Sequence, residues 1–466
     1  KAVFFNGKYY QPMPFPQEKP IKNALIDNRK PVFFSKQTGE KVLDLSLPEA
    51  PAPAGESDPG LPGVMHSLKE KELQLPDIFS NLAQVNDPTP YPASANVKLF
   101  MEFPNGASYQ CSGAMIDSRH VLTAGHCVHL IAAGGWANEI LVAPAYDGGI
   151  DPYYGYSTGL NMTSWNGWIY NELWDDDMAI IEIDRPVGAL SGTFGYGYND
   201  NNSFFTGNTF HNFGYPAAGP YNGQHMYYWY GNFDYTYNNF RVYHFNEAYG
   251  GQSGSNAYHL NANGNRYVYA CLSHGNAVET GHTRINSSKF NTIQGLIQQN
   301  TPGSPDLVPL KTFASPQTID AGTAFSEFQF LVHNYASVAY SGNLSIDFYL
   351  STNDYISTSD LYLGTRTATG TSILAKGTQS YSVTSNPIAI PGSVQPGDYY
   401  VGIILNINDY ETGNNYTVGY DTYPVEVTCG TPPAPTLNQT GTVVRCSGQS
   451  LTITASACSG CTVQWS

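Results

Sequence analysis

The sequence predicts an all-β, exported protein built from several domains. Charged side chains make up 12% of the 466 residues, whereas Gly and Tyr are abundant, at 46 and 35 copies. This composition favours strands joined by tight turns, because surface helices draw mainly on Glu, Lys and Arg. Hydrophobic residues form 41% of the chain, enough for several cores, and the length corresponds to roughly three domains.

The charge balance excludes whole classes of partner. There are 21 basic and 37 acidic side chains, a net charge of −16. Such a chain repels phosphate backbones and anionic membranes, so we expect no nucleic-acid partner. No apolar run approaches the roughly 18 residues of a membrane span. The chain starts at Lys1 rather than Met, which predicts a removed signal peptide and an extracellular location.

Residues 1–84 differ in composition from the rest. They hold 10 basic and 10 acidic groups and 11 of the 31 prolines, including the Pro/Ala stretch at residues 47–62. We interpret them as a removable leader, or propeptide, ending in a linker. The alternative is an N-terminal extension that stays attached.

Residues 85–304 have the pattern of a β-barrel domain closed by a C-terminal helix. Short strands are expected at residues 97–102, 178–183 and 267–272, and a helix at residues 287–299. The breaker-rich linker at 301–305 follows.

Two further modules are predicted after the linker. Residues 305–428 alternate as in a β-sandwich, with strands at 328–332, 345–350 and 399–405. Residues 429–466 begin with a proline-rich joint at 431–435, which leads to residues 446–465. They are too few for a complete sandwich and predict a truncated module.

The strongest motif ends in a histidine. Residues 121–127 read Val-Leu-Thr-Ala-Gly-His-Cys, and Cys111 lies 16 positions before Cys127. The segment resembles the catalytic-histidine region of chymotrypsin-like serine proteases. The resemblance implies a double β-barrel, a disulfide between Cys111 and Cys127, and His126 as general base. A structural histidine beside an ordinary disulfide is the alternative.

The second motif supplies a carboxylate. Residues 174–181 read Trp-Asp-Asp-Asp-Met-Ala-Ile-Ile, similar to the strand start that carries the aspartate of these proteases. The Ala and the apolar spacing select Asp177, which would hold the imidazole in the right tautomer. Asp175 and Asp176 then fall in the preceding loop. A run of acids taken alone is most often a solvated turn.

The third motif supplies the nucleophile. Residues 249–255 read Tyr-Gly-Gly-Gln-Ser-Gly-Ser and resemble the Gly-x-Ser-Gly signature of the same family. The resemblance implies that Ser253 is the nucleophile and that the amides of Gly251 and Ser253 form the oxyanion hole. The order His126, Asp177, Ser253 is the order of the chymotrypsin family.

Further residues predict the branch of the family. The Gly-Gln-Ser-Gly-Ser run, residues 213–216 and residues 283–285 look like the bacterial glutamyl endopeptidases, which implies a preference for Glu or Asp before the scissile bond. His274, between Ser273 and Gly275, is the candidate for binding the substrate carboxylate. A rim histidine without this role is the alternative.

Two positions of the expected substrate pocket depart from that branch. Ala248 replaces the usual Thr or Ser, and Glu247 stands where trypsin-like members carry the acid that selects Arg or Lys. A preference for basic or aromatic residues therefore stays open.

The resemblance also implies a zymogen. The mature start is expected near residues 84–88, where processing would free an amine that completes the pocket. The chain is expected to act as a monomer on protein or peptide substrates, without a metal or other cofactor in the reaction.

The C-terminal half favours attachment over chemistry. Residues 305–427 resemble the CARDB module of bacterial surface and secreted proteins, and residues 430–466 an immunoglobulin-like repeat. Asp354 and Asp360 offer a Ca²⁺ site or an ordinary turn. The competing interpretation is therefore a surface adhesin with an inactive protease domain. The seven cysteines leave at least one without a partner in this chain, and the pairing of Cys271, Cys429, Cys446, Cys458 and Cys461 is open.

Overall fold

The computed structural model describes residues 1–17, 29–43, 53–65, 82–149, 152–276 and 278–429. The chain forms two compact units, one over residues 1–301 and the other from residue 302 onward. The expected immunoglobulin-like repeat at residues 430–466, with Cys446, Cys458 and Cys461, lies outside the described residues.

The first half of unit 1 is a closed barrel. Six strands pair in the order β8-β7-β12-β13-β14-β9, and β9 pairs back onto β8. The strands are β7 (Asn96–Glu102), β8 (Ser108–Asp117), β9 (His120–Thr123), β12 (Glu139–Pro144), β13 (Ser157–Trp165) and β14 (Ala179–Ile183). The strands predicted at 97–102 and 178–183 are confirmed as β7 and β14. A small ribbon, β10 (His129–Leu130) with β11 (Gly135–Trp136), flanks this barrel.

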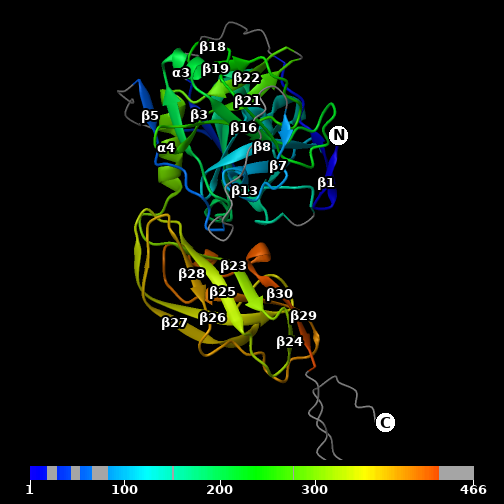
Figure 1. Cartoon of the computed structure of the whole chain (residues 1–466), viewed down its shortest axis with the longest axis vertical. Helices are drawn as coiled ribbons and strands as arrows, with labels where there is room; N and C mark the ends of the chain where they lie inside the picture. Colours follow the sequence, from blue (N-terminus) through cyan, green and yellow to red (C-terminus); the bar gives the residue numbers. More distant parts are fainter. Residues whose placement is uncertain (18–28, 44–52, 66–81, 150–151, 277, 430–466) are drawn as a thin grey trace, which may run out of the picture. The chain divides into compact units, whose positions relative to one another are not determined.

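The second half of unit 1 is built on β21, which pairs with β20, β22 and β15. Its strands are β15 (Gly195–Asn199), β16 (Phe210–Gly214), β17 (Tyr227–Gly231), β18 (Tyr235–Tyr237), β19 (Arg241–His244), β20 (Asn256–Leu260), β21 (Arg266–Gly275) and β22 (Thr280–Arg284). The strand predicted at 267–272 lies within β21. The two halves make the chymotrypsin-like double β-barrel (Figure 1).

Short helices lie between the strands of the two halves, and one longer helix ends the unit. They are η2 (Ala93–Ala95), η3 (Gly125–Cys127), η4 (Ile131–Ala133), α1 (Asn166–Asn171), η5 (Trp174–Asp176), α2 (Gly188–Ser191), α3 (Asn202–Gly207) and α4 (Ser287–Asn300). The helix predicted at 287–299 is confirmed as α4. Asn286 caps it by accepting a hydrogen bond from the Lys289 amide at 3.0 Å. Phe290, Ile293 and Leu296 recur at helical spacing and are buried in the core.

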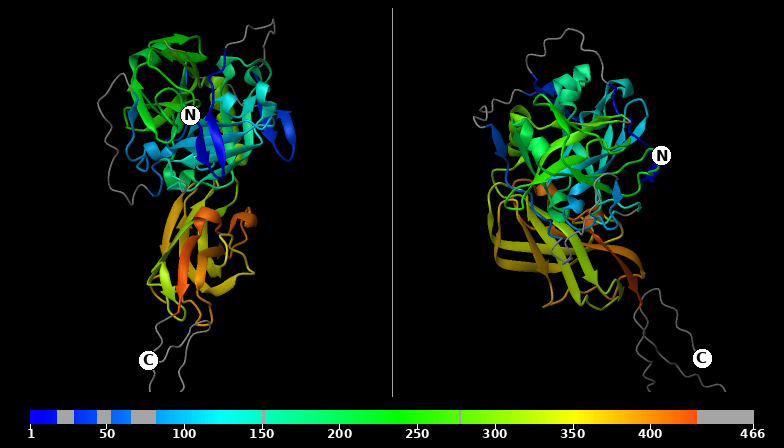
Figure 2. Two further views of the ribbon diagram at one scale, coloured as in Figure 1. Left: turned by 90° about the vertical axis from the view of Figure 1, so that its right-hand side faces the viewer. Right: turned by 45° about the horizontal axis from the view of Figure 1, so that its top comes forward.

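The predicted leader is built into unit 1. It contributes β1 (Val3–Phe5), β2 (Lys8–Pro12), β3 (Pro31–Ser35), β4 (Gly39–Val42), β5 (Ala54–Glu56) and β6 (Ala83–Gln84). Strand β2 pairs with β8 and β3 with β13 on the first barrel, whereas β5 pairs with β15 and β6 with β17 on the second. Figure 2 shows these blue strands at separate places on the unit.

The leader also contributes to the hydrophobic core. Val3, Phe5 and Tyr10 are at most 2% exposed and belong to the main cluster of unit 1. The Phe5 ring stacks on Phe100 of β7 at 4.2 Å between centroids. Burying side chains of this size contributes about 1.5–3 kcal/mol each. The leader is therefore part of the folded unit.

The linker predicted at residues 47–62 is structured over its second half. Residues 54–56 form β5, and Pro62 forms an isolated bridge with Gly192. Gly60 explains this close fit, because a Cβ there would lie 2.2 Å from the Thr193 carbonyl oxygen. In this proline- and glycine-rich stretch, the backbone packs directly on the backbone of residues 192–194. The composition of the stretch does not predict such packing.

Unit 2 is a β-sandwich of a three-stranded and a five-stranded sheet. Its elements are β23 (Leu307–Ser315), β24 (Thr318–Asp320), β25 (Glu327–Asn334), β26 (Tyr340–Ser351), β27 (Leu361–Ile373), β28 (Thr378–Ser382), β29 (Gly397–Leu405), η6 (Thr412–Asn414), η7 (Gly419–Asp421) and β30 (Tyr423–Thr428). The strands predicted at 328–332, 345–350 and 399–405 lie in β25, β26 and β29. Phe328 and Phe348 meet between the sheets, 5.0 Å apart.

The two aspartates singled out for Ca²⁺ make turn contacts in unit 2. The Asp360 carboxylate accepts hydrogen bonds from the Ser357 amide and hydroxyl at 2.7 and 2.9 Å. The Asp354 carbonyl accepts one from the Gly419 amide at 2.7 Å. Calcium binding at these residues stays a prediction.

Candidate active site

His126 lies in the short helix η3, directly after β9, and a disulfide fixes the turn. Cys111 of β8 is bonded to Cys127, as the resemblance implied. The His126 side chain is 1% exposed. Its backbone amide donates to Asp177 Oδ1 at 2.8 Å, so the carboxylate holds the main chain of this turn as well as the ring.

Asp177 orients the imidazole. The residue follows η5 and precedes β14, whose pairing with β9 brings it beside His126. His126 Nδ1 lies 2.8 Å from Asp177 Oδ2 and 3.1 Å from Oδ1. An ionised carboxylate only accepts hydrogen bonds, so the proton of a neutral imidazole stays on Nδ1 and Nε2 keeps its lone pair.

The two aspartates before Asp177 are held by cations of three different segments. Arg29 of the leader contacts Asp175 Oδ2 at 3.0 Å and Asp176 Oδ1 at 3.1 Å. Arg241 of β19 pairs with Asp175 at 2.8 Å, and Lys289 of α4 pairs with Asp176 at 3.1 Å. Asp176 is fully buried. This acid run is an ion-pair network rather than a solvated turn, and it anchors the start of β14.

Ser253 lies in a turn that depends on glycine. Gly251 has φ of +99°, and a Cβ on it would lie 2.6 Å from the Tyr215 carbonyl oxygen. The Ser253 carbonyl accepts a hydrogen bond from the Ser112 amide at 2.8 Å, which joins the turn to β8. Within the described part of the chain, neither the Gly251 nor the Ser253 amide donates to the protein. Both can therefore serve an oxyanion.

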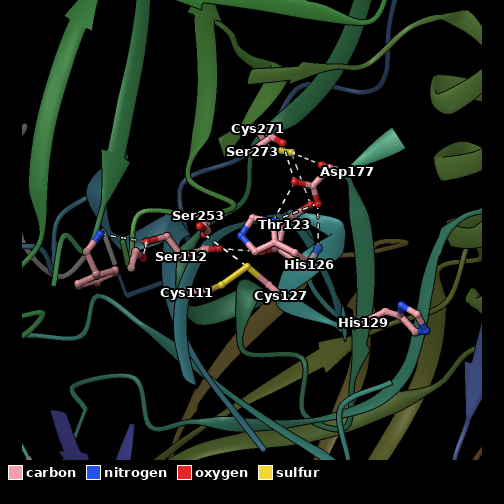
Figure 3. The surroundings of a disulfide bond; sticks show 12 residues. Cys111, Ser112, Thr123, His126, Cys127, His129, Asp177, Ser253, Cys271 and Ser273 are labelled. Atoms are coloured by element: carbon pink, nitrogen blue, oxygen red, sulfur yellow. Dashed lines mark hydrogen bonds and ion pairs between the residues drawn. A yellow bond between two sulfur atoms is a disulfide. The ribbon is translucent and has the colours of Figure 1, made fainter. Parts of the chain in front are cut away.

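The His126 ring lies between Ser253 and the Asp177 carboxylate (Figure 3). Both His126 Nε2 and Ser253 Oγ are buried, and neither has a hydrogen-bond partner among the described residues. An imidazole nitrogen with an open lone pair beside a serine hydroxyl is the arrangement that deprotonates the hydroxyl during attack on a carbonyl.

Ser273 was expected on the substrate side, but its hydroxyl faces the carboxylate. Ser273 Oγ donates to Asp177 Oδ2 at 2.5 Å. The residue lies on β21, and Asp177 lies 96 positions earlier in the chain. The sequence gives no signal for this contact, because it depends on how the two halves of unit 1 meet.

His274 is engaged on both ring nitrogens. Nδ1 lies 3.0 Å from Ser273 Oγ, and Nε2 lies 3.1 Å from Tyr243 Oη. The ring is 3% exposed and stacks on Trp174 at 3.6 Å between centroids. Burial and the nearby Arg241 cation lower the pKa of His274 well below its ordinary value. The ring is therefore neutral at neutral pH in this state.

The other residues of the expected pocket differ in exposure. Glu247 is exposed, and its carboxylate accepts a hydrogen bond from Tyr249 Oη. Ala248 and Gly275 are half-buried. Sequence reasoning missed Tyr243 and Arg241, which approach this region from β19.

Cys271 lies on β21 close to the site and is a free thiol. Burial and the Asp177 carboxylate raise its pKa well above the ordinary value. A thiol held protonated is a poor nucleophile, so Cys271 does not compete with Ser253.

Cys111, His126 and Cys127 bring three potential metal-ligating atoms within 4.8 Å of one another. Both sulfur atoms belong to the disulfide. Neither can act as a thiolate ligand, so the donor set does not fit a metal.

Comparisons with known proteins each match part of the chain. Residues 85–239 match the family model described as trypsin. An extracellular metalloprotease of Bacillus subtilis is 28% identical over 213 residues, which are 45% of this chain and 66% of that protein. A glutamyl endopeptidase of Bacillus licheniformis is 31% identical over 134 residues, which are 29% of this chain and 40% of that protein.

One similar solved structure is that of a Glu endopeptidase in complex with MPD. It is 20% identical, has a TM-score of 0.40, and the match covers 47% of this chain and 96% of that one. The chain spans 66% and 40% of the two curated relatives, so it corresponds to only part of each.

Proposed function

We propose that the protein is a secreted serine endopeptidase that hydrolyses peptide bonds through an acyl-enzyme on Ser253. The observation that carries the proposal is the His126 ring, whose Nδ1 is bound to Asp177 at 2.8 Å while its Nε2 stays open beside Ser253.

The reaction follows from these atoms. His126 Nε2 takes the Ser253 hydroxyl proton as Oγ attacks the substrate carbonyl carbon, and the amides of Gly251 and Ser253 receive the developing oxyanion. His126 then gives the proton to the leaving amine, and the C–N bond breaks. Water, deprotonated by the same nitrogen, releases the acyl group and restores Ser253. Asp177 stays ionised and stabilises the imidazolium.

A preference for Glu or Asp before the scissile bond is part of the proposal. The relative named glutamyl endopeptidase supports it. The exposed Glu247 also supports it, because an acid that selects Arg or Lys would be expected at the closed end of a pocket. We assign His274 as the carboxylate ligand. A substrate carboxylate would take the place of Tyr243 Oη at Nε2 and favour the protonated ring.

Export, processing and attachment complete the proposal. The disulfide fits an oxidising compartment, and among the described helices none is long and apolar enough to span a bilayer. Processing near residues 84–88 would convert a zymogen into the mature enzyme. The CARDB-like sandwich would hold the enzyme, acting as a monomer, at a cell surface or matrix.

A fluorophosphonate probe tests the nucleophile. We expect covalent labelling that Ser253→Ala abolishes, with peptide turnover reduced about 10⁶-fold. Ser203→Ala, which removes an exposed hydroxyl on α3, is the matched control and should label normally. No labelling of processed protein would instead favour an adhesin with an inactive protease domain.

A peptide-library cleavage profile tests the specificity. The wild type is expected to cut after Glu and Asp, and His274→Ala should lose that preference while still reacting with the probe, at a rate lowered by the loss of the hydrogen bond to Ser273. Cleavage after Glu that is unchanged in His274→Ala would refute the assignment of His274. Cleavage after Lys, Arg or aromatic residues would refute the glutamyl preference.

A further inference from the structure

One short piece of the leader lies across the proposed active site. After β2 runs parallel to β8, the Met13 amide donates to the Gln110 carbonyl oxygen at 3.2 Å. Gln110 directly precedes Cys111 of the disulfide. Met13 is fully buried, although it belongs to a segment that composition marks as a linker-like leader.

The same piece continues over the turn that carries Ser253. A Cβ on Gly250 would lie 2.9 Å from the Met13 carbonyl oxygen and 3.5 Å from Pro12 Cβ. Gly250 is three residues before Ser253. The leader backbone therefore packs on the nucleophile turn itself, and the missing side chain at Gly250 makes room for it.

The piece then reaches the strand that flanks the site on the other side. A Cβ on Gly275 would lie 3.4 Å from Phe15 Cε2, an ordinary contact distance. Gly275 ends β21, two residues after Ser273, whose hydroxyl binds Asp177. With the leader in place, Ser253 and His126 are 0% and 1% exposed.

We propose that Gln110, Gly250 and Gly275 form the peptide-binding surface of the enzyme and that Pro12–Phe15 occupies it as a built-in inhibitor. The inference rests on the proposed function, because it takes Ser253 as the nucleophile. The surface binds an extended apolar peptide with proline at alternate positions.

The chemistry of the segment explains how it survives next to a nucleophile. Residues 11–16 read Gln-Pro-Met-Pro-Phe-Pro, so each of their five peptide bonds has a proline on one side. The ring fixes φ and fills the space beside the nitrogen. It also pre-forms an extended chain, so little conformational entropy is lost on binding. The segment therefore binds without presenting to Ser253 a peptide bond that is free of proline.

Contacts between the leader and the barrels flank the segment on both sides. On its N-terminal side, Gln110 Nε2 donates to the Tyr10 carbonyl at 3.0 Å, and Lys98 Nζ donates to Gln110 Oε1 at 2.5 Å. On its C-terminal side, Arg29 binds Asp175 and Asp176. Held in this way, the segment has a high effective concentration at the site. A cut near residue 84 would leave it bound, so activation also requires that the leader dissociates or is degraded.

The test measures the rate of fluorophosphonate labelling in the unprocessed full chain. Met13→Asp puts a charge at a fully buried position, and Phe15→Ala removes the ring at Gly275. Both are expected to speed labelling of Ser253 about tenfold or more, because the open form becomes populated. Tyr9→Ala is the matched control, since this leader side chain is 68% exposed, and it should label like the wild type.

A second measurement covers the case in which Met13→Asp does not fold. A synthetic peptide of residues 8–17, added to full-chain Phe15→Ala, should slow labelling again, and the same peptide with all prolines replaced by Ala should do so less. Wild type that labels as fast as Phe15→Ala, with no effect of the peptide, would overturn the inhibitor and leave the protease intact. Failure of every variant to label, before and after processing, would overturn the proposed function instead.

Discussion

Tyr243 and His274 are joined by a contact of 3.1 Å between the tyrosine hydroxyl oxygen and His274 Nε2. Arg241 Nη1 donates to the same hydroxyl at 2.7 Å. Because a guanidinium only donates, the hydroxyl proton is directed to Nε2, and the imidazole proton stays on Nδ1 facing Ser273. Ser273 in turn donates to Asp177. A directed chain of hydrogen bonds thus runs from the Arg241 cation to the Asp177 carboxylate.

Replacing Tyr243 by Phe tests this chain. Without the Tyr243 hydroxyl, the His274 proton is no longer held on Nδ1, and the hydrogen bond to Ser273 is weakened. The hydrogen bonding that stabilises Asp177 falls by about one bond, so kcat should fall about tenfold. Steady-state kinetics on a peptide substrate measure the change.

The control for that variant is Tyr170→Phe, which removes an exposed hydroxyl bonded to Glu40. It should leave kcat unchanged. A Tyr243→Phe enzyme that loses thermal stability while its kcat stays unchanged would show that Tyr243 only packs.

Glycine at position 251 is expected to be indispensable for turnover. In Gly251→Ala the new methyl group would meet the Tyr215 carbonyl oxygen at 2.6 Å, so the turn must shift and the oxyanion donors with it. Loss of one such donor costs about 10²–10³ in kcat. The control is Gly264→Ala. Gly264 also has a positive φ, +77°, which strains an alanine, but no atom lies within 4 Å of the added carbon. Equal activity loss in both variants would attribute the effect to backbone strain alone.

Three histidines with lowered pKa values predict a loss of stability in mild acid. Burial lowers the pKa of His129 and His211 to about 4 and of His244 to about 3. Below pH 6.5 the unfolded chain binds protons that the folded one does not, so the free energy of unfolding falls with pH down to these values.

The expected size is roughly 1–2 kcal/mol per histidine between pH 6.5 and 5. Urea titrations at pH 7 and 5 measure it. His244→Gln should flatten the dependence. A free energy of unfolding that stays constant over this range would contradict the burial of these rings.

The disulfide should hold the His126 turn against unfolding. Replacing Cys111 and Cys127 together by Ala removes a cross-link over 16 residues, which costs about 3 kcal/mol in the chain-entropy model. Cys271→Ala, at the free buried thiol, should cost less because no loop is opened. Melting temperatures of the two variants and the wild type, compared without reductant, measure the difference. A double variant that melts like the wild type would show that the surrounding sheet fixes the turn unaided.

The parts of the site that could be predicted are those that one segment carries by itself. His126 with its flanking cysteine, Asp177 before an apolar strand, and the glycines around Ser253 each form a local pattern, and the order of the three limits the fold. The contacts that the sequence did not reveal join distant segments. Ser273, Tyr243 and Arg29 reach the site only through the pairing of strands, and their residue types suit many other roles.

The leader shows why composition was a poor guide. Its many prolines and balanced charge suggest a linker. In the structure, however, Val3, Phe5 and Tyr10 are buried in the core, and Val3 and Phe5 alternate with an exposed residue as in a short strand. These short strands form because strands of the two barrels pair with them. The pairing joins segments that are far apart in the sequence, so the composition of the leader alone does not predict it.

Strands β2 and β3 of the leader also pair with the free edges of two strands of the first barrel. Strand β2 covers β8 at Tyr109 and Gln110, and β3 covers β13 from Asn161 to Trp165. An enzyme without its leader would present these backbone amides and carbonyls to any extended polypeptide, as an uncovered sheet edge does. Removal of the leader would therefore expose new sites for strand addition, with self-association as the hazard when the cleaved protein is concentrated.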